Sequence, residues 1–169
     1  MYHSITFAEL TGGTYTNDEA VNADRKELSG MLKGYNTWYD WHLIPTSRPT
    51  IAHPEVLTKF VQIPGKSGQL DLTNYVCTKS VYANRTGTLQ FYAIEEYTDY
   101  RVLRTEMMRI LHGRKLRINL EDDPLYYYVG RIEVNGWVNE KSRPKISITY
   151  NLEPYKYSIA TGERQINDL

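Results

Sequence analysis

The sequence is built of short runs in which apolar and polar residues alternate, each bounded by turn-forming residues. Successive side chains of a strand point to opposite faces, so a period of two predicts a half-buried β-strand. Residues 145–152 are the clearest run, with apolar positions Ile146, Ile148, Tyr150 and Leu152. Similar runs lie at 1–7, 56–65, 76–82, 88–93, 115–120 and 126–134. The sequence therefore predicts a chain of many short strands.

One segment changes to a helical period. It follows Thr98, a favourable N-cap, and its apolar residues are Tyr100, Leu103, Met107 and Leu111. Gly113 then provides the left-handed residue that commonly ends a helix. The sequence therefore predicts a mainly β (α+β) domain, a β-sandwich or partial barrel with one flanking α-helix.

Turn residues suggest how the strands connect. Asn135-Gly136 is a strong signal for a two-residue hairpin loop, and residues 84–87 predict another hairpin. Residues 65–69 and 121–124 are expected to form turns.

Two polar segments depart from the strand pattern. Residues 9–34 contain either a short helix, capped by Asn17 or Asp18, or a loop. Residues 158–169 are expected to form a polar C-terminal tail, so that residues 1–157 make one domain.

The stretch NTWYDWHLIPTSRP, residues 36–49, combines two tryptophans with two prolines. Proline fixes φ and removes a backbone donor, which excludes residues 43–50 from a central strand. We expect an extended N-terminal arm over residues 36–54. Its aromatic part can pack in the chain's own core, on a ligand or on another chain, and one of the two tryptophans is expected in the core.

Composition disfavours some classes of protein and excludes one kind of cross-link. Lys plus Arg equals Asp plus Glu, 20 of each, which disfavours a nucleic-acid-binding protein because such binding rests on neutralising phosphates. The single cysteine, Cys77, excludes an intrachain disulfide. The start lacks the pattern of a signal peptide, and no apolar run approaches the roughly 20 residues of a membrane span, so we expect folding in the cytoplasm. The 15 tyrosines weakly favour subunit contacts.

No motif for catalysis, cofactor binding or metal binding is present. Glu121-Asp122-Asp123 lacks the alternate spacing of a cation loop, so a solvated turn is the favoured interpretation. The histidines are scattered at positions 3, 42, 53 and 112. We therefore expect no enzyme activity, no cofactor and no metal.

Several blocks occur in the order found in one known family. They are YNTWYDWHLIPTSRP (35–49), VQIPGKSGQLDLT (61–73), YANRTGTLQF (82–91), LHGRKLRINLEDDPLYYYVGRIEV (111–134) and ISITYNLEPYKY (146–157). Together with the opening strand, they resemble the short distal tail proteins of long-tailed bacteriophages and prophages. Typical members pass almost directly from the first strand to the NTW block, so residues 9–34 are an insertion.

The resemblance implies a tail-tube-related fold and a hexameric ring at the tip of the phage tail. Such a ring joins the tail tube and tape measure protein to the baseplate hub or tail-associated protein, and DNA passes through its lumen. It implies assembly in the bacterial host cytoplasm and a final place in the virion. An extended arm in such rings contacts the adjacent subunit. The residues that we assign to that arm are Trp38, Trp41, Leu43, Ile44, Pro45 and Pro49.

Two alternatives remain at this point. A tail-tube or tail-completion protein of the same architecture would stack copies instead of capping the tube. A carbohydrate-binding β-sandwich would instead use surface tyrosines and Trp137. The chain ends soon after the last matching block, which disfavours direct receptor binding.

Overall fold

The computed structural model describes residues 2–14, 32–75, 78–94, 100–139 and 143–166. The predicted helix starting at Asn17 or Asp18, Cys77 and the predicted cap Thr98 lie outside these residues. The described elements are β1 (Ile5–Ala8), β2 (Tyr35–Asn36), β3 (Leu43–Pro45), β4 (Val56–Leu57), β5 (Phe60–Gln62), β6 (Gln69–Asp71), β7 (Val81–Tyr82), β8 (Arg85–Ala93), α2 (Tyr100–Leu111), β9 (Lys115–Leu120), β10 (Asp123–Asn139), β11 (Pro144–Ser158) and β12 (Arg164–Gln165).

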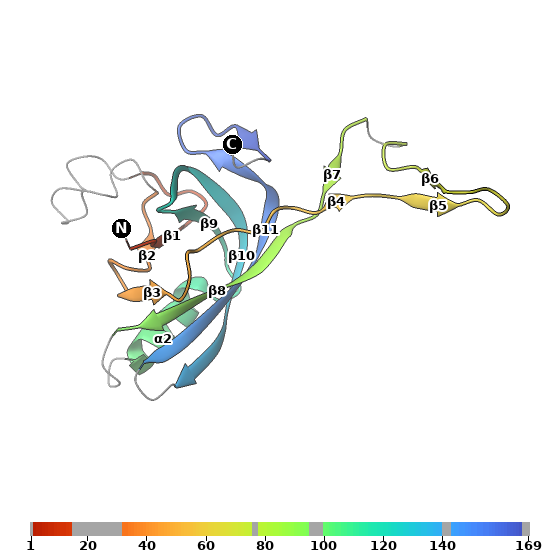
Figure 1. Ribbon diagram of the computed structural model, residues 1–169. Helices are drawn as coiled ribbons and strands as arrows, with labels where there is room; N and C mark the ends of the chain where they lie inside the picture. The colour runs from red at the N-terminus through yellow and green to blue at the C-terminus, as the bar shows by residue number, and fades with distance from the viewer. Residues whose placement is uncertain (1, 15–31, 76–77, 95–99, 140–142, 167–169) are drawn as a thin grey trace.

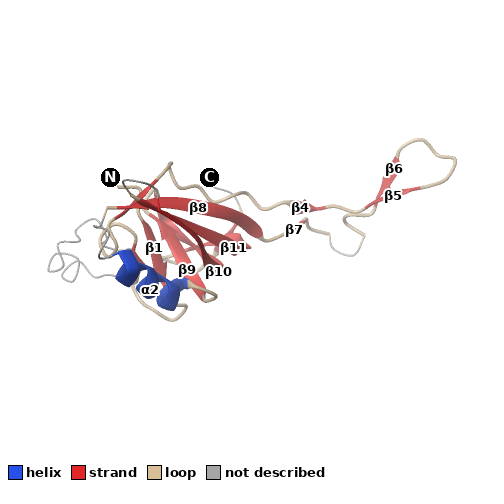
Figure 2. Ribbon diagram, turned by 90° about the horizontal axis from the view of Figure 1, so that it is seen from below, coloured by secondary structure: helices blue, strands red, loops and turns tan. Residues whose placement is uncertain are grey.

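One antiparallel sheet organises the domain. It has eight strands in the order β2-β1-β9-β10-β11-β8-β3, with β12 paired to β11. The long strands β10 and β11 carry the curl of this sheet, and α2 covers one of its faces (Figures 1 and 2). The predicted mainly β fold with one flanking helix is therefore confirmed. Among the described strands the core is closed by one curled sheet and the helix, not by two stacked sheets.

The core lies between the helix and the curled sheet. The helix buries Leu103, Met107 and Leu111, which are three of the four predicted apolar positions, and ends before Gly113, whose φ is 73°. The side chain of the fourth, Tyr100, lies outside the description. On β11 the apolar positions of the clearest alternating run are buried, as predicted: Ile146, Ile148, Tyr150 and Leu152. Both periodicities correctly identified the face that packs inward.

Both predicted hairpin loops of this sheet are wrong. Asn135 and Gly136 lie within β10, where the pairing moves from Val134 opposite Ile148 to Trp137 opposite Ile146. That step places one extra residue on β10, which is a β-bulge. Residues 85–87 likewise lie within β8 and pair with β11. At residues 135–136 the runs on both sides pair with β11, so β10 continues through the predicted loop. At residues 84–87 the run before the predicted loop ends in β7, which pairs with β4, while the run after it pairs with β11. In both cases pairing with other strands overrides the local turn preference.

Two glycines of β10 provide a direct test of this register. A Cβ at Gly130 would lie 2.2 Å from the carbonyl oxygen of Asn151, whereas a Cβ at Gly136 would meet nothing closer than Ser147 Oγ at 4.0 Å. Gly130→Ala is therefore expected to lower the free energy of unfolding by about 1–3 kcal/mol, as overpacking does. Gly136→Ala should change it little, because its φ is not in the left-handed region.

Chemical denaturation of the two variants measures both values. A large decrease in the free energy of unfolding for Gly136→Ala would restore the hairpin interpretation, since a type I′ turn requires positive φ at that position.

The C-terminal segment, predicted as a polar tail, adds a strand to the sheet within its described residues. Arg164 pairs with Tyr157 and Gln165 with Lys156, so this segment adds β12 beside the end of β11. It brings Ile166 close to the start of β8, where Arg85 reaches its carbonyl oxygen.

Candidate functional site: a projecting extension and its base

Part of the predicted arm lies inside the domain. Trp41 is 2% exposed and Leu43 is fully buried. The Trp41 ring stacks on Tyr35 with ring centroids 5.7 Å apart and also contacts Phe7 at 6.4 Å. Asn36 holds the turn that precedes Trp41, because its side-chain oxygen accepts hydrogen bonds from the backbone N–H groups of residues 38 and 39. Trp41 is therefore the one core tryptophan that the sequence predicts.

The other predicted arm residues lie at the edge of the sheet. Trp38 is half-buried and stacks on Tyr2, with ring centroids 4.0 Å apart. Ile44 and Pro45 belong to the edge strand β3, where Ile44 is exposed, while Pro49 is buried. Residues 36–49 thus form the end of β2, a turn, the edge strand β3 and a following loop of the domain, and they do not project from it.

The segment that does project is residues 53–75 and 78–83, which we call the extension. It leaves the sheet after β3 and returns into β8, with β4 paired to β7 and β5 paired to β6 along its length. Figures 1 and 2 show it reaching far from the curled sheet in both views. Its end is the predicted turn at residues 65–69, where Gly65 and Gly68 have φ values of 79° and 83°.

The extension exposes large apolar side chains along most of its length. They are Val56, Leu57, Phe60, Val61, Leu70, Tyr75 and Val81, each between 37% and 84% exposed. Val56 and Leu57 are consecutive in β4, as are Phe60 and Val61 in β5, so both faces of the ribbon are apolar. A two-stranded ribbon is marginal in water, and apolar exposure on this scale marks an interaction surface.

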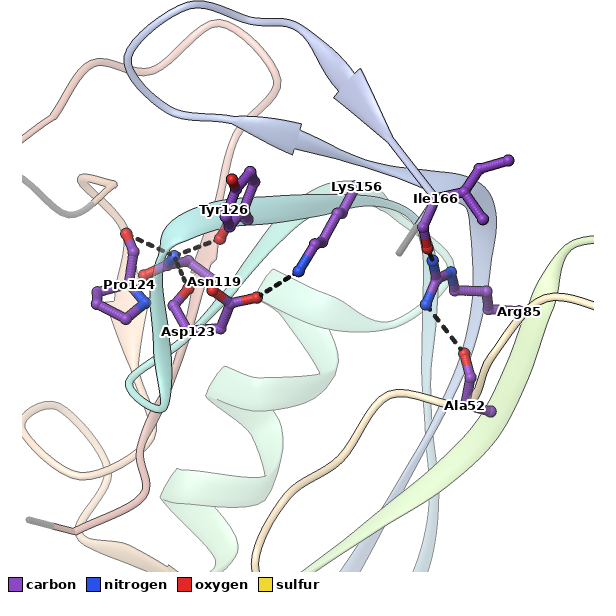
Figure 3. Close-up of polar contacts among 8 residues, drawn as sticks. All are labelled: Ala52, Arg85, Asn119, Asp123, Pro124, Tyr126, Lys156 and Ile166. Carbon is purple, nitrogen blue, oxygen red and sulfur yellow. Dashed lines mark hydrogen bonds and ion pairs between the residues drawn. The ribbon is translucent and has the colours of Figure 1, made fainter. Parts of the chain in front are cut away.

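Polar contacts hold the base of the extension against the sheet. The backbone N–H of Ala52 donates to Tyr150 Oη at 3.0 Å, and Asn84 donates to the Asn151 side chain at 2.9 Å. The fully buried Arg85 donates to backbone carbonyl oxygens, two of which, those of Ala52 and Ile166, are drawn in Figure 3. The extension therefore starts from an ordered base.

The carboxylates of the turn between β9 and β10 bind separate partners. Glu121 accepts from the Ser4 backbone and hydroxyl, and Asp123 pairs with the buried Lys156 at 3.0 Å (Figure 3). Asp122 accepts from His3 at 2.8 Å and from Arg48 at 3.0 Å. The turn itself is confirmed, but its carboxylates are half-buried and bonded, not solvated as expected. No group of ligands suited to a metal ion occurs among the described residues.

The Asp122 contacts predict a pH dependence. Burial alone would raise the pKa of its carboxyl, but the hydrogen bonds from His3 and Arg48, with their charges, hold that pKa below the usual value. The resulting stabilisation is present above the unfolded-state pKa of about 3.9 and is lost as pH falls through the lower folded-state pKa.

Thermal melts of the wild type and Asp122→Asn across pH 7 to 3 measure this effect. We expect the wild type to have the higher melting temperature at neutral pH, and the difference between the two proteins to shrink towards the acidic end. A difference that stays constant over this range would contradict the assignment.

A cleft of about 520 Å³ lies beside these charged groups. Its polar lining includes Arg48, Asp122 and Lys156, and Tyr126 contributes a ring whose centroid is 4.4 Å from Lys156 Nζ. Both signs of charge line the cleft, so it has no preference for an anion or a cation. Trp137, the tryptophan of the carbohydrate-binding alternative, is half-buried and packs against the core, so only part of its surface is open to a ligand.

Comparisons with known proteins support the fold. No family model matches the sequence, and no curated protein matches it. The structure is similar to the crystal structure of the Dit protein of phage SPP1, described as a paradigm of the hub adsorption apparatus in phages that infect Gram-positive bacteria. The TM-score is 0.55 and the identity 18%, over 76% of this chain and 51% of that one. The chain thus spans about half of that protein's length, and the likeness is one of fold.

The helix that the structure describes is too short and too polar to cross a membrane.

Proposed function

We propose that this chain is a structural protein of a phage tail tip, whose copies close into a ring, and that the ring is hexameric. The observation that carries the proposal is the extension, which exposes apolar side chains on both faces and contributes none of its described residues to the hydrophobic core. The fold similarity to the SPP1 Dit protein supports the tail-tip assignment.

The geometry suits a head-to-tail contact between copies. An extension that lies on the domain of the next copy uses two different surfaces, and such a contact generates a ring when the rotation closes. The exposed Ile44 on the edge strand β3, together with Trp38 and Pro45, forms the receiving edge in this proposal. Trp41, Leu43 and Pro49 support that edge from inside the domain.

In the virion the ring would join the tail tube and tape measure protein on one side to the baseplate hub or tail-associated protein on the other. DNA would pass through the lumen without sequence-specific contacts, in keeping with the zero net charge. The role is mechanical and needs no catalytic group, cofactor or metal. Assembly would take place in the cytoplasm of the bacterial host.

Electron microscopy of the purified protein, combined with light scattering, tests this proposal. Closed rings of about six copies are expected, in line with the predominance of closed symmetries among homo-oligomers. Long tubes would favour the tail-tube alternative, and monomers at high concentration would overturn the proposal. Glycan binding by a monomeric chain would favour the carbohydrate-binding alternative.

A further inference from the structure

Arg85 is the most unusual buried side chain at the base of the extension. It is fully buried, and its bonds to the described residues go to backbone carbonyl oxygens. Nε donates to Pro154 at 2.9 Å, Nη1 to Ala52 at 3.3 Å and Nη2 to Ile166 at 2.8 Å. The guanidinium carbon also lies 5.2 Å from the ring centroid of Tyr128.

These carbonyl groups belong to separate segments. Ala52 immediately precedes the extension, Pro154 belongs to β11, and Ile166 follows β12. Arg85 itself is the first residue of β8, into which the extension returns. One guanidinium therefore links the outgoing and returning strands of the extension to the sheet and to the C-terminal segment (Figure 3).

The chemistry of this group explains why it can fix an orientation. A guanidinium is planar and holds its donors in a rigid fork, so bonds to separate segments constrain their relative positions. Ala52 is constrained twice, because its N–H donates to Tyr150 Oη while its carbonyl accepts from Arg85. Buried polar groups are costly to leave unpaired, which disfavours other arrangements of the base.

We infer that Arg85 is a positioning residue that fixes the direction in which the extension leaves the sheet, with the segment at Ile166 as part of the same clamp. A small change of angle at the base becomes a large displacement at the tip. A fixed direction lowers the ordering cost of each contact between copies. This consequence for assembly rests on the proposed function, whereas the fixed direction is a property of the single chain.

Distances between two spin labels test the direction itself. One label is placed at Ser67 in the tip and one at the exposed Thr88 on β8, in a chain with Cys77→Ser and with excess unlabelled protein to dilute the spins. We expect a narrow distance distribution for this chain and a distribution about twofold broader or more for Arg85→Met, because local opening at the base is then no longer opposed. A distribution of unchanged width would overturn the inference.

A stability control separates direction from general destabilisation. Ile146→Ala removes a fully buried side chain of the core, and it is expected to lower the melting temperature without broadening the distribution. If Arg85→Met fails to fold, Arg85→Lys and Tyr150→Phe take its place. Lys carries its donors on a single nitrogen and so cannot reproduce the spread of Nε, Nη1 and Nη2 that reaches the three carbonyl oxygens. Phe removes only the bond to Ala52, so both variants are expected to broaden the distribution.

Assembly gives the second readout. Arg85→Met is expected to raise the concentration needed for assembly about tenfold, which corresponds to about 1.4 kcal/mol. If the wild type does not assemble, the proposed function fails while the spin-label distances still decide the inference. If the wild type assembles and Arg85→Met retains both its assembly and its narrow distribution, the inference fails and the proposed function stands.

Discussion

Replacing Leu57, Phe60 and Leu70 by serine is expected to convert the assembled protein into folded monomers. All three side chains are exposed in the single chain, with 52%, 52% and 44% of their surfaces accessible. Substitutions at exposed positions usually change the free energy of unfolding by no more than about 0.5 kcal/mol. Buried apolar residues at the centre of an interface can each contribute about 2 kcal/mol or more to association.

The combined effect on association should therefore be large. Even without additivity, a loss of about 4 kcal/mol corresponds to roughly a thousandfold weaker contact. Light scattering gives the mass of the particles, and a far-UV melting curve reports whether the domain remains folded.

Exposed apolar residues of the domain provide matched controls. Val102 on α2 and Leu125 on β10 are 68% and 69% exposed, more than the residues of the triple variant. Val102→Ser and Leu125→Ser are expected to assemble like the wild type. Rings formed by the triple variant would show that the extension is not the contact, and monomers formed by a control would place the contact on the domain.

Sequence patterns predicted the elements that bury one continuous face. In β11 the side chains at 146, 148, 150 and 152 meet the core while their neighbours do not, so the period of two is complete. In α2 the same holds for Leu103, Met107 and Leu111 at the helical period. Where one face is buried, hydrophobic periodicity and tertiary structure carry the same information.

Sequence patterns do not reveal the extension, because the strands β4, β5, β6 and β7 contribute no residue to the core. Residues 56–65 and 76–82 were expected to be strands of the domain, and nothing local shows that β4 and β5 pair instead with β7 and β6. One signal was present. The adjacent apolar pairs Val56-Leu57 and Phe60-Val61 break the alternation expected of a strand with one buried face. Apolar pairs of this kind suit a ribbon that is covered on both faces by partners.

Local sequence does not show, for a related reason, that residues 36–49 pack on the domain. Their tryptophans and prolines suggested an interface strap, but the depth of a side chain depends on contacts made far away in the sequence. Trp41 is buried by Tyr35 and Phe7, and Leu43 is buried on β3 beside β8. The core role of Trp41 leads to a prediction opposite to that of an exposed arm.

Trp41→Ala is expected to destabilise the domain itself. Removing a buried tryptophan usually lowers the free energy of unfolding by about 3–5 kcal/mol, a large part of the total stability of a small domain. Trp41→Phe should lower the free energy of unfolding much less, because it keeps an aromatic ring. It also gives up no hydrogen bond of the described residues, since the indole N–H of Trp41 has no acceptor among them. Urea denaturation followed by far-UV circular dichroism measures both variants, with Trp38→Ala as the half-buried control.

The alternative outcome is equally specific. If Trp41 lay on a neighbouring copy, Trp41→Ala would keep the stability of the dissociated chain and lose only assembly. Measuring unfolding at a concentration below that of assembly separates the two cases, because association then adds nothing to the apparent stability. A variant with wild-type stability under these conditions would return Trp41 to the interface, and a strongly destabilised one places it in the core that supports β3.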